Sequence, residues 1–135
     1  LRRGDIVRTL HDHEINDFNT DCVAVTTIDE PNHETGGGAH HMYGVSYGDP
    51  SGEKGDPGLA VLEFQNGPVS EAGVNGITNE ALIAVVLDRL RSFQKSPYSC
   101  RENALMITKL EEALMWGHKR TLDRVRRGVE GKHEL

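Results

Sequence analysis

Apolar side chains recur at helical spacing between residues 78 and 128, in the second half of the chain. Thr78 carries the hydroxyl preferred at a helix N-cap. Ser96-Pro97 ends the first helix, because the proline ring clashes with an α-helical residue before it. The segment 81–87 is apolar at every position, so we expect the sheet to cover one of its faces and a second copy of the chain another. A homo-oligomer follows as a hypothesis.

A second helix is predicted after a short break at residues 95–99. Ser99 and Glu102 have the spacing of a capping box, in which each side chain bonds an orphan backbone N–H. Gly128 follows a basic last turn and predicts the end of this helix. Within the helix, an apolar stripe is predicted from Leu110, Leu114 and the group Ala113, Met115 and Trp116.

Three segments of the first half are predicted strands, at residues 21–28, 40–47 and 59–65. Glycine- and proline-rich turns separate them, at 36–38, 48–58 and 66–68, while Ile6-Val7 is either a further strand or an arm. The prediction is an α+β fold with a small antiparallel sheet at about 20–66 and an antiparallel two-helix hairpin at about 79–95 and 100–127.

One domain is expected for 135 residues, with two differently charged parts. Residues 1–76 are mainly β with acidic loops, and residues 77–135 form a helical hairpin for oligomerisation and ligand binding. Residues 1–75 hold 4 Lys and Arg against 13 Asp and Glu, whereas residues 76–135 hold 11 against 8. This balance argues against a partner of polymeric nucleic acid, which requires a broad basic face, but it leaves room for a compact anion.

The two cysteines, Cys22 and Cys100, are too few and too far apart for a disulfide scaffold. We expect both to be buried free thiols in a reducing cytosol. No apolar run approaches the roughly 20 residues that span a bilayer, and the start of the chain lacks the apolar core of a signal peptide. No membrane partner is therefore expected.

Enzyme signatures are weak in this chain. Gly36-Gly37-Gly38 lacks the Gly-Lys-Ser/Thr of a phosphate loop, and no Gly-x-Ser-x-Gly or comparable nucleophile context occurs. Four histidines lie in two close pairs and could in principle build a metal site: His11, His13, His40 and His41. Scattered histidines in polar segments are more often solvated, so a metal-dependent hydrolase stays an alternative and no metal or cofactor is expected.

The second helix has a basic face with a possible ligand role. Arg120, Arg124 and Arg127 are spaced by four and three, so they line one side of the helix, and guanidinium forks suit phosphate oxygens. The simpler interpretation is a solvated last turn that complements the helix dipole. Phe93 either stacks on a base or covers the turn, and Asn103 either binds a base edge or faces water.

From FQNGPVSEAGVNGITNEALIAVVLDRL through FQKSPYSCRENALMITKLEEALMWGHKRTLDRVRRGVEGKH, the chain resembles phage proteins of the first anti-Thoeris sponge family. The segment KLEEALMWGHKR is also similar to the helical hairpin of the anti-CBASS cyclic-oligonucleotide sponge. The resemblance covers about residues 59–133. It implies a binding protein that sequesters cyclic ADP-ribose isomers, with cyclic di- and trinucleotides at a separate site, and that assembles as dimers joined into hexamers.

The resemblance also implies roles for particular residues. Phe93 matches an aromatic residue that packs the ligand, Asn103 an asparagine that hydrogen-bonds it, and Arg120 an arginine that holds its phosphates. Arg124 and Arg127 match basic positions at the oligomer interface or at a second nucleotide site.

The resulting hypothesis is a non-enzymatic anti-defence protein in the cytoplasm of an infected bacterial host. It would bind cyclic nucleotide immune signals without cleaving them and so block Thoeris and CBASS signalling. The alternatives are an oligomerising structural or protein-interaction module of a phage, and the histidine-based metal hydrolase.

Overall fold

A computed structural model describes residues 8–15, 23–31, 37–49 and 51–128 of the chain. The chain divides into two compact units, a sheet unit at residues 1–67 and a helical unit at residues 68–135. The sequence analysis placed the boundary between the β part and the helical hairpin between residues 76 and 77. Within the described ranges, no helix is long and apolar enough to cross a membrane.

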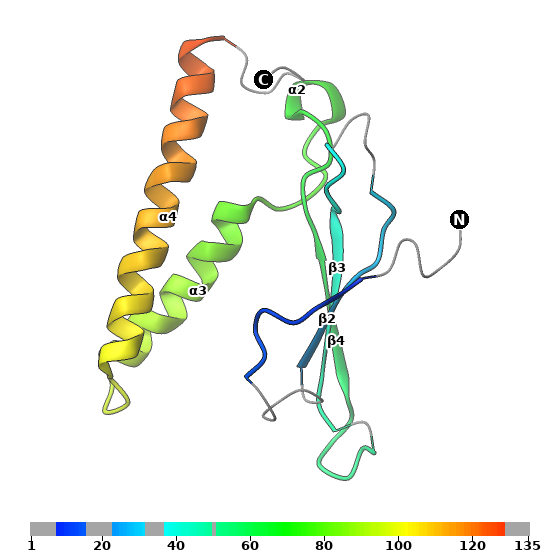
Figure 1. Cartoon of the computed structure of the whole chain (residues 1–135), viewed down its shortest axis with the longest axis vertical. Coiled ribbons are helices and arrows are strands. Elements are labelled where there is room, and N and C mark those ends of the chain that lie inside the picture. The colour runs from blue at the N-terminus through cyan, green and yellow to red at the C-terminus, as the bar shows by residue number, and fades with distance from the viewer. Residues whose placement is uncertain (1–7, 16–22, 32–36, 50, 129–135) are drawn as a thin grey trace. The chain divides into compact units, whose positions relative to one another are not determined.

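In its described residues the sheet unit holds four antiparallel strands in the order β1-β2-β3-β4 (Figure 1). They are β1 (Thr9–Leu10), β2 (Val23–Thr27), β3 (Met42–Tyr47) and β4 (Gly58–Glu63). The three predicted strands and the antiparallel sheet are confirmed. The sequence analysis did not predict β1, because two residues carry no readable alternation, and Ile6-Val7 lies outside the described residues.

Asp29 joins the end of β2 to the start of β3. Its carboxylate accepts hydrogen bonds from the backbone N–H groups of His41 (2.8 Å) and Met42 (3.1 Å). Burial raises the pKa of Asp29, but these backbone donors and His40 outweigh it and hold the pKa below its ordinary value. Asp29 therefore stabilises the sheet in its ionised form, and that contribution is lost when acid protonates it.

Between residues 68 and 128 the helical unit contains a short helix and two long ones, α2 (Val69–Ala72), α3 (Asn79–Gln94) and α4 (Arg101–Arg126). The two long helices lie side by side and run antiparallel (Figure 1). Thr78 accepts a hydrogen bond from the Ala81 backbone N–H at 3.0 Å, which confirms the predicted cap. Gly128 has a φ of 73°, a left-handed conformation that suits glycine, and ends α4 as predicted.

The predicted capping box at Ser99 and Glu102 is wrong. Cys100 is the N-cap of α4, without a side-chain cap. Instead, Gln94 reaches across the turn: its amide oxygen accepts from the Cys100 N–H and its amide nitrogen donates to the Cys100 carbonyl, both at 3.0 Å. A residue six positions earlier thus satisfies the backbone that a local capping box was expected to satisfy.

Replacing Gln94 with alanine should loosen this turn. We expect the free energy of unfolding to fall by about 1–2 kcal/mol, because two net hydrogen bonds are lost. Urea denaturation followed by circular dichroism measures the change. Gln94→Glu keeps an acceptor for the Cys100 N–H and loses the donor, so it should lie between wild type and Gln94→Ala; an unchanged midpoint for both variants would contradict this role.

The two long helices meet along a narrow seam. On α3, Leu87 is 1% exposed and Leu90 is 9% exposed, and these are the buried apolar side chains among the described residues. On α4 the less exposed positions recur at spacings of four and three: Asn103, Ile107, Leu110, Leu114 and Gly117. This is the heptad-like spacing of an antiparallel pair of helices.

Several side chains predicted to be covered are exposed in the single chain. Met115 (69%) and Trp116 (64%) lie outside the seam, so the predicted stripe is narrower and consists of Leu110 and Leu114. Val85 in the apolar segment of α3 is 59% exposed. Cys100 is a free thiol but an exposed one, which corrects the expectation of burial, and Cys22 lies outside the described residues.

Candidate ligand-binding site

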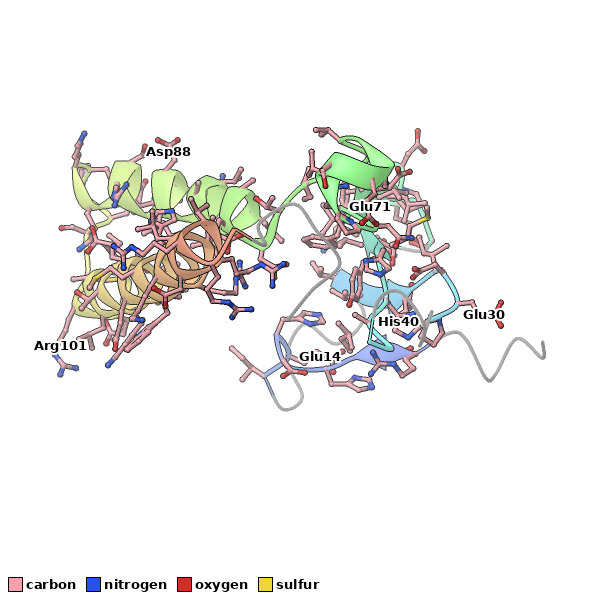
Figure 2. All side chains as sticks on the ribbon, turned by 90° about the horizontal axis from the view of Figure 1, so that it is seen from above. Glu14, Glu30, His40, Glu71, Asp88 and Arg101 are labelled. Carbon is pink, nitrogen blue, oxygen red and sulfur yellow. The ribbon has the colours of Figure 1, made fainter. Side chains whose placement is uncertain are left out.

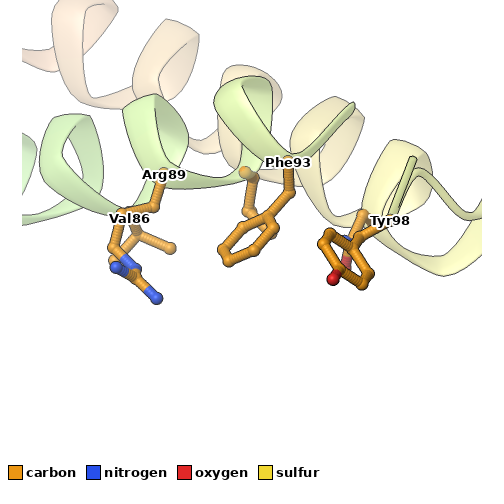
Figure 3. Close-up of a pocket in the computed structure, with 6 residues that line it drawn as sticks. Val86, Arg89, Phe93 and Tyr98 are labelled. Atoms are coloured by element: carbon orange, nitrogen blue, oxygen red, sulfur yellow. The ribbon is translucent and has the colours of Figure 1, made fainter. Parts of the chain in front are cut away.

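A hollow of about 380 Å³ opens at the turn end of the helical hairpin. Side chains of α3 form most of its lining, the turn adds an aromatic ring, and the first turn of α4 adds an amide (Figure 3). The lining residues are Val86, Arg89, Leu90, Phe93, Tyr98 and Asn103. An apolar floor with an aromatic wall, one guanidinium and one amide is the composition expected of a small-molecule site.

The turn places the two aromatic rings. The Ser96 hydroxyl donates to the Phe93 carbonyl at 2.6 Å and accepts from the Tyr98 backbone N–H at 3.1 Å. One serine therefore connects the last turn of α3 with the residue that carries the second ring. Phe93 is 40% exposed and Tyr98 is 76% exposed, so both rings present accessible faces.

Arg89 lies against the Phe93 ring. Its guanidinium carbon is 5.5 Å from the ring centroid, a cation–π distance. The two residues are four positions apart on α3, so they are neighbours on the helix surface. Figure 3 shows Val86, Arg89, Phe93 and Tyr98 as a continuous row along one side of the hairpin.

A second hollow of about 390 Å³ adjoins the first. Arg89, Phe93 and Tyr98 line both hollows. The remaining residues that line the second hollow are all polar: Asp88, Ser92 and Ser96. Figure 2 shows Asp88 on the outer side of α3, directed away from α4.

The hairpin brings together two of the five residues singled out from the sequence. Phe93 and Asn103 line the same hollow. Arg120, Arg124 and Arg127 lie farther along α4, and the 17 residues from Asn103 to Arg120 correspond to about 25 Å of helix. Within one chain, those three arginines do not line this hollow.

Arg120 is held by an acidic residue of α3. Its Nη2 donates to Glu80 Oε1 at 2.6 Å, and the two side chains are 59% and 24% exposed. Gly117 allows this approach, since a Cβ there would lie 2.6 Å from Glu80 Oε1. An anionic ligand that recruits Arg120 has to compete with Glu80.

Phe93 and Arg120 lie at opposite ends of the hairpin. Phe93 is in the last turn of α3, whereas Arg120 lies in the second half of α4 and donates to Glu80 at the start of α3. A second ion pair, between Arg91 and Glu111 at 2.9 Å, joins the two helices nearer the turn.

The basic face of α4 is partly neutralised. Lys119 donates to Asp123 at 2.7 Å, and Arg126 lies 3.6 Å from the same carboxylate. The hydrogen bond from Lys119 and the neighbouring positive charges lower the pKa of Asp123 below its ordinary value. Arg124 is half-buried, and Arg127 is the exposed C-cap residue of α4. The predicted row of arginines is therefore not a uniform cationic surface.

The histidines of the metal-hydrolase alternative do not converge. His11 Nδ1 lies 3.1 Å from Glu14, His13 Nε2 lies 2.8 Å from the Val23 carbonyl, and His40 Nδ1 lies 2.8 Å from the Asp29 carbonyl. In the described part of the chain, no three His, Cys, Asp or Glu residues are grouped so that they could hold a metal ion. The geometry does not favour this alternative.

Sequence reasoning singled out Phe93 and Asn103 and missed the other four lining residues, among them the polar and aromatic residues Arg89 and Tyr98. Arg89 could have been found from its spacing of four to Phe93. Tyr98 could not, because its position depends on the Ser96 bridge in the turn.

Comparison with known proteins shows what this hairpin is similar to. Residues 60–122 match the family model described as the Acb2/Tad1 hairpin domain. The match includes Phe93, Asn103 and Arg120 and ends before Arg124 and Arg127. It confirms the resemblance noted from the helical sequence.

This chain is also similar to a curated protein, Thoeris anti-defense 1 of Bacillus phage SBSphiJ7. The two are 63% identical over 76 residues, which cover 56% of this chain and 54% of the relative. The chain thus spans about half the length of this relative.

Proposed function

We propose that this chain is an anti-defence sponge that binds cyclic nucleotide immune signals and sequesters them without cleavage. The ligands are cyclic ADP-ribose isomers, with cyclic di- and trinucleotides as further ligands, and the consequence is a block of Thoeris and CBASS signalling. The observation that carries the proposal is the shared hollow of Phe93 and Asn103 on an Acb2/Tad1 hairpin domain. The name of the SBSphiJ7 relative, Thoeris anti-defense 1, supports it.

The chemistry of the hollow suits a nucleotide. A purine stacks on an exposed aromatic face such as that of Phe93, which contributes about 1–3 kcal/mol per base. The Asn103 amide offers both a donor and an acceptor to a base edge. A sponge requires enclosure and has no need of a nucleophile or a metal, so we assign no catalytic residue and no cofactor.

A second copy of the chain completes the site in this proposal. Phe93 and Arg120 lie at opposite ends of the hairpin, so two hairpins that pair antiparallel bring Arg120 of one copy to Phe93 of the other. Exposed apolar side chains support such pairing, among them Val86, Met106 and Trp116. Pairing also excludes water from the phosphates, which strengthens each guanidinium contact. Further association of such dimers gives the hexamer.

The basic tail has a secondary role in the proposal. Arg124 and Arg127 contribute to the oligomer interface or to a second nucleotide site. The protein acts where the signal is made, in the cytoplasm of the infected bacterial host.

Uptake and release of intact ligand is the test. The protein is incubated with cyclic ADP-ribose isomers and with cyclic di- and trinucleotides, unbound ligand is removed, and the protein is heat-denatured. We expect the ligand to disappear from solution and to return chemically unchanged on heating. Degraded ligand would indicate a hydrolase, and a solution that is never depleted would indicate a structural or interaction module.

A further inference from the structure

Arg89 is the cation already present in the hollow. It lines both hollows and contacts the Phe93 ring, yet within the described residues no carboxylate lies within ion-pair distance of its guanidinium. Arg120, by contrast, is paired with Glu80 at 2.6 Å. A phosphate that binds Arg89 therefore does not have to displace a carboxylate, as a phosphate that binds Arg120 does.

We propose that Arg89 is a phosphate-binding residue that covers Phe93 in the free protein and leaves the ring when a nucleotide binds. The adenine then stacks on Phe93 in its place, and the guanidinium turns to the phosphates from the junction of the two hollows. This inference rests on the proposed function, because it names a further residue of the same site and gives it a switching role.

The relative strengths of the two contacts favour the movement of Arg89 from the Phe93 ring to a phosphate. An exposed cation–π contact changes an equilibrium constant by about two- to five-fold. A hydrogen bond between a guanidinium and a phosphate changes it by about 10- to 100-fold. The flexible stem of Arg89 allows the head group to move while the helix stays fixed, since its backbone lies inside α3.

Arg89→Met separates phosphate binding from packing, because methionine keeps an apolar stem against Phe93 and removes the charge. We expect a cyclic ADP-ribose isomer to bind Arg89→Met about 10- to 100-fold more weakly than wild type in calorimetry. Adenosine, which has no phosphate, should bind both proteins equally within about five-fold in an NMR titration. The matched control is Arg101→Met, which removes the same charge from a side chain that points away from the helices (Figure 2).

The NMR signals of Arg89 give a direct readout of the switch. In the free protein the ring current of Phe93 should shift the Arg89 side-chain protons, and this shift should disappear when the cyclic ADP-ribose isomer binds. Arg89→Lys, which retains the charge without the planar fork, should recover part of the affinity. A ring-current shift that persists in the complex would overturn the switch.

The outcomes separate this inference from the proposed function. Wild type that takes up no cyclic nucleotide overturns the proposed function and Arg89 with it. Wild type that binds while Arg89→Met binds equally well overturns only the role of Arg89. An equal loss of adenosine and of the cyclic ADP-ribose isomer shows that Arg89 only supports the shape of the hollow, and also overturns the inference.

Discussion

Leu87→Ala should lower the free energy of unfolding by about 2–5 kcal/mol, the range for a large-to-small change at a buried site. Leu87 is 1% exposed and lies at the centre of the seam, and only Leu90 joins it among the buried apolar side chains of the described residues. The other contacts between α3 and α4 involve partly exposed side chains, so the loss of Leu87 removes the most deeply buried part of the seam. Urea denaturation followed by helical circular dichroism measures the loss.

Leu105→Ala is the matched control, because it is the same chemical change at a side chain that is 44% exposed. We expect a loss below about 1 kcal/mol in dilute protein. A loss of unfolding free energy for Leu105→Ala that grows to that of Leu87→Ala at high protein concentration would indicate that a second copy of the chain covers Leu105. A change below about 1 kcal/mol for Leu87→Ala would contradict the central place of Leu87 in the seam.

Arg120→Ala should weaken uptake of a cyclic ADP-ribose isomer by about 100-fold, because it removes the charge-assisted contact to phosphate that we propose for a site closed by two copies of the chain. The oligomer should persist, since the Arg120–Glu80 pair is largely exposed and such pairs stabilise a protein by at most about 1 kcal/mol. Calorimetry measures the affinity, and sedimentation measures the assembly.

Two further variants interpret this result. Arg126→Ala removes an equal charge from a side chain that is 77% exposed, and it should bind as wild type does. Glu80→Gln removes the competitor of the ligand for Arg120, so it should bind at least as tightly as wild type. Normal affinity of Arg120→Ala would show that Arg120 is misassigned.

The helices could be predicted because their signals are local. Thr78 and Gly128 mark a start and an end by their own backbone preferences, and Pro97 excludes helix at the residue before it. The strands were predictable from runs of β-branched residues between turns. The start of α4 was predicted to within a residue, but its capping box was wrong, because Gln94, six residues away, supplies the hydrogen bonds that Ser99 and Glu102 were expected to supply.

The site was predictable only in part. Phe93 and Asn103 were singled out from the sequence, mainly by resemblance, and they line one hollow. Tyr98 lines the same hollow because the Ser96 hydroxyl bonds both the Phe93 carbonyl and the Tyr98 N–H, and no periodic pattern in the sequence predicts this bridge. The counter-charge on Arg120 was also missed, because Glu80 is 40 residues away in the chain and reaches it only when the two helices pack.

The sequence alone determined the α+β order of elements, the bounds of the helices to within a few residues and the kinship of the hairpin, because each depends on neighbouring residues or on matching letters. Only the tertiary structure decided which apolar residues form the seam, which arginines are already paired, and which side chains share the hollow. Those properties depend on the contact of α3 with α4, where residues far apart in the chain meet. Leu87, Glu80 and Arg89 owe their roles to that contact and not to their local sequence.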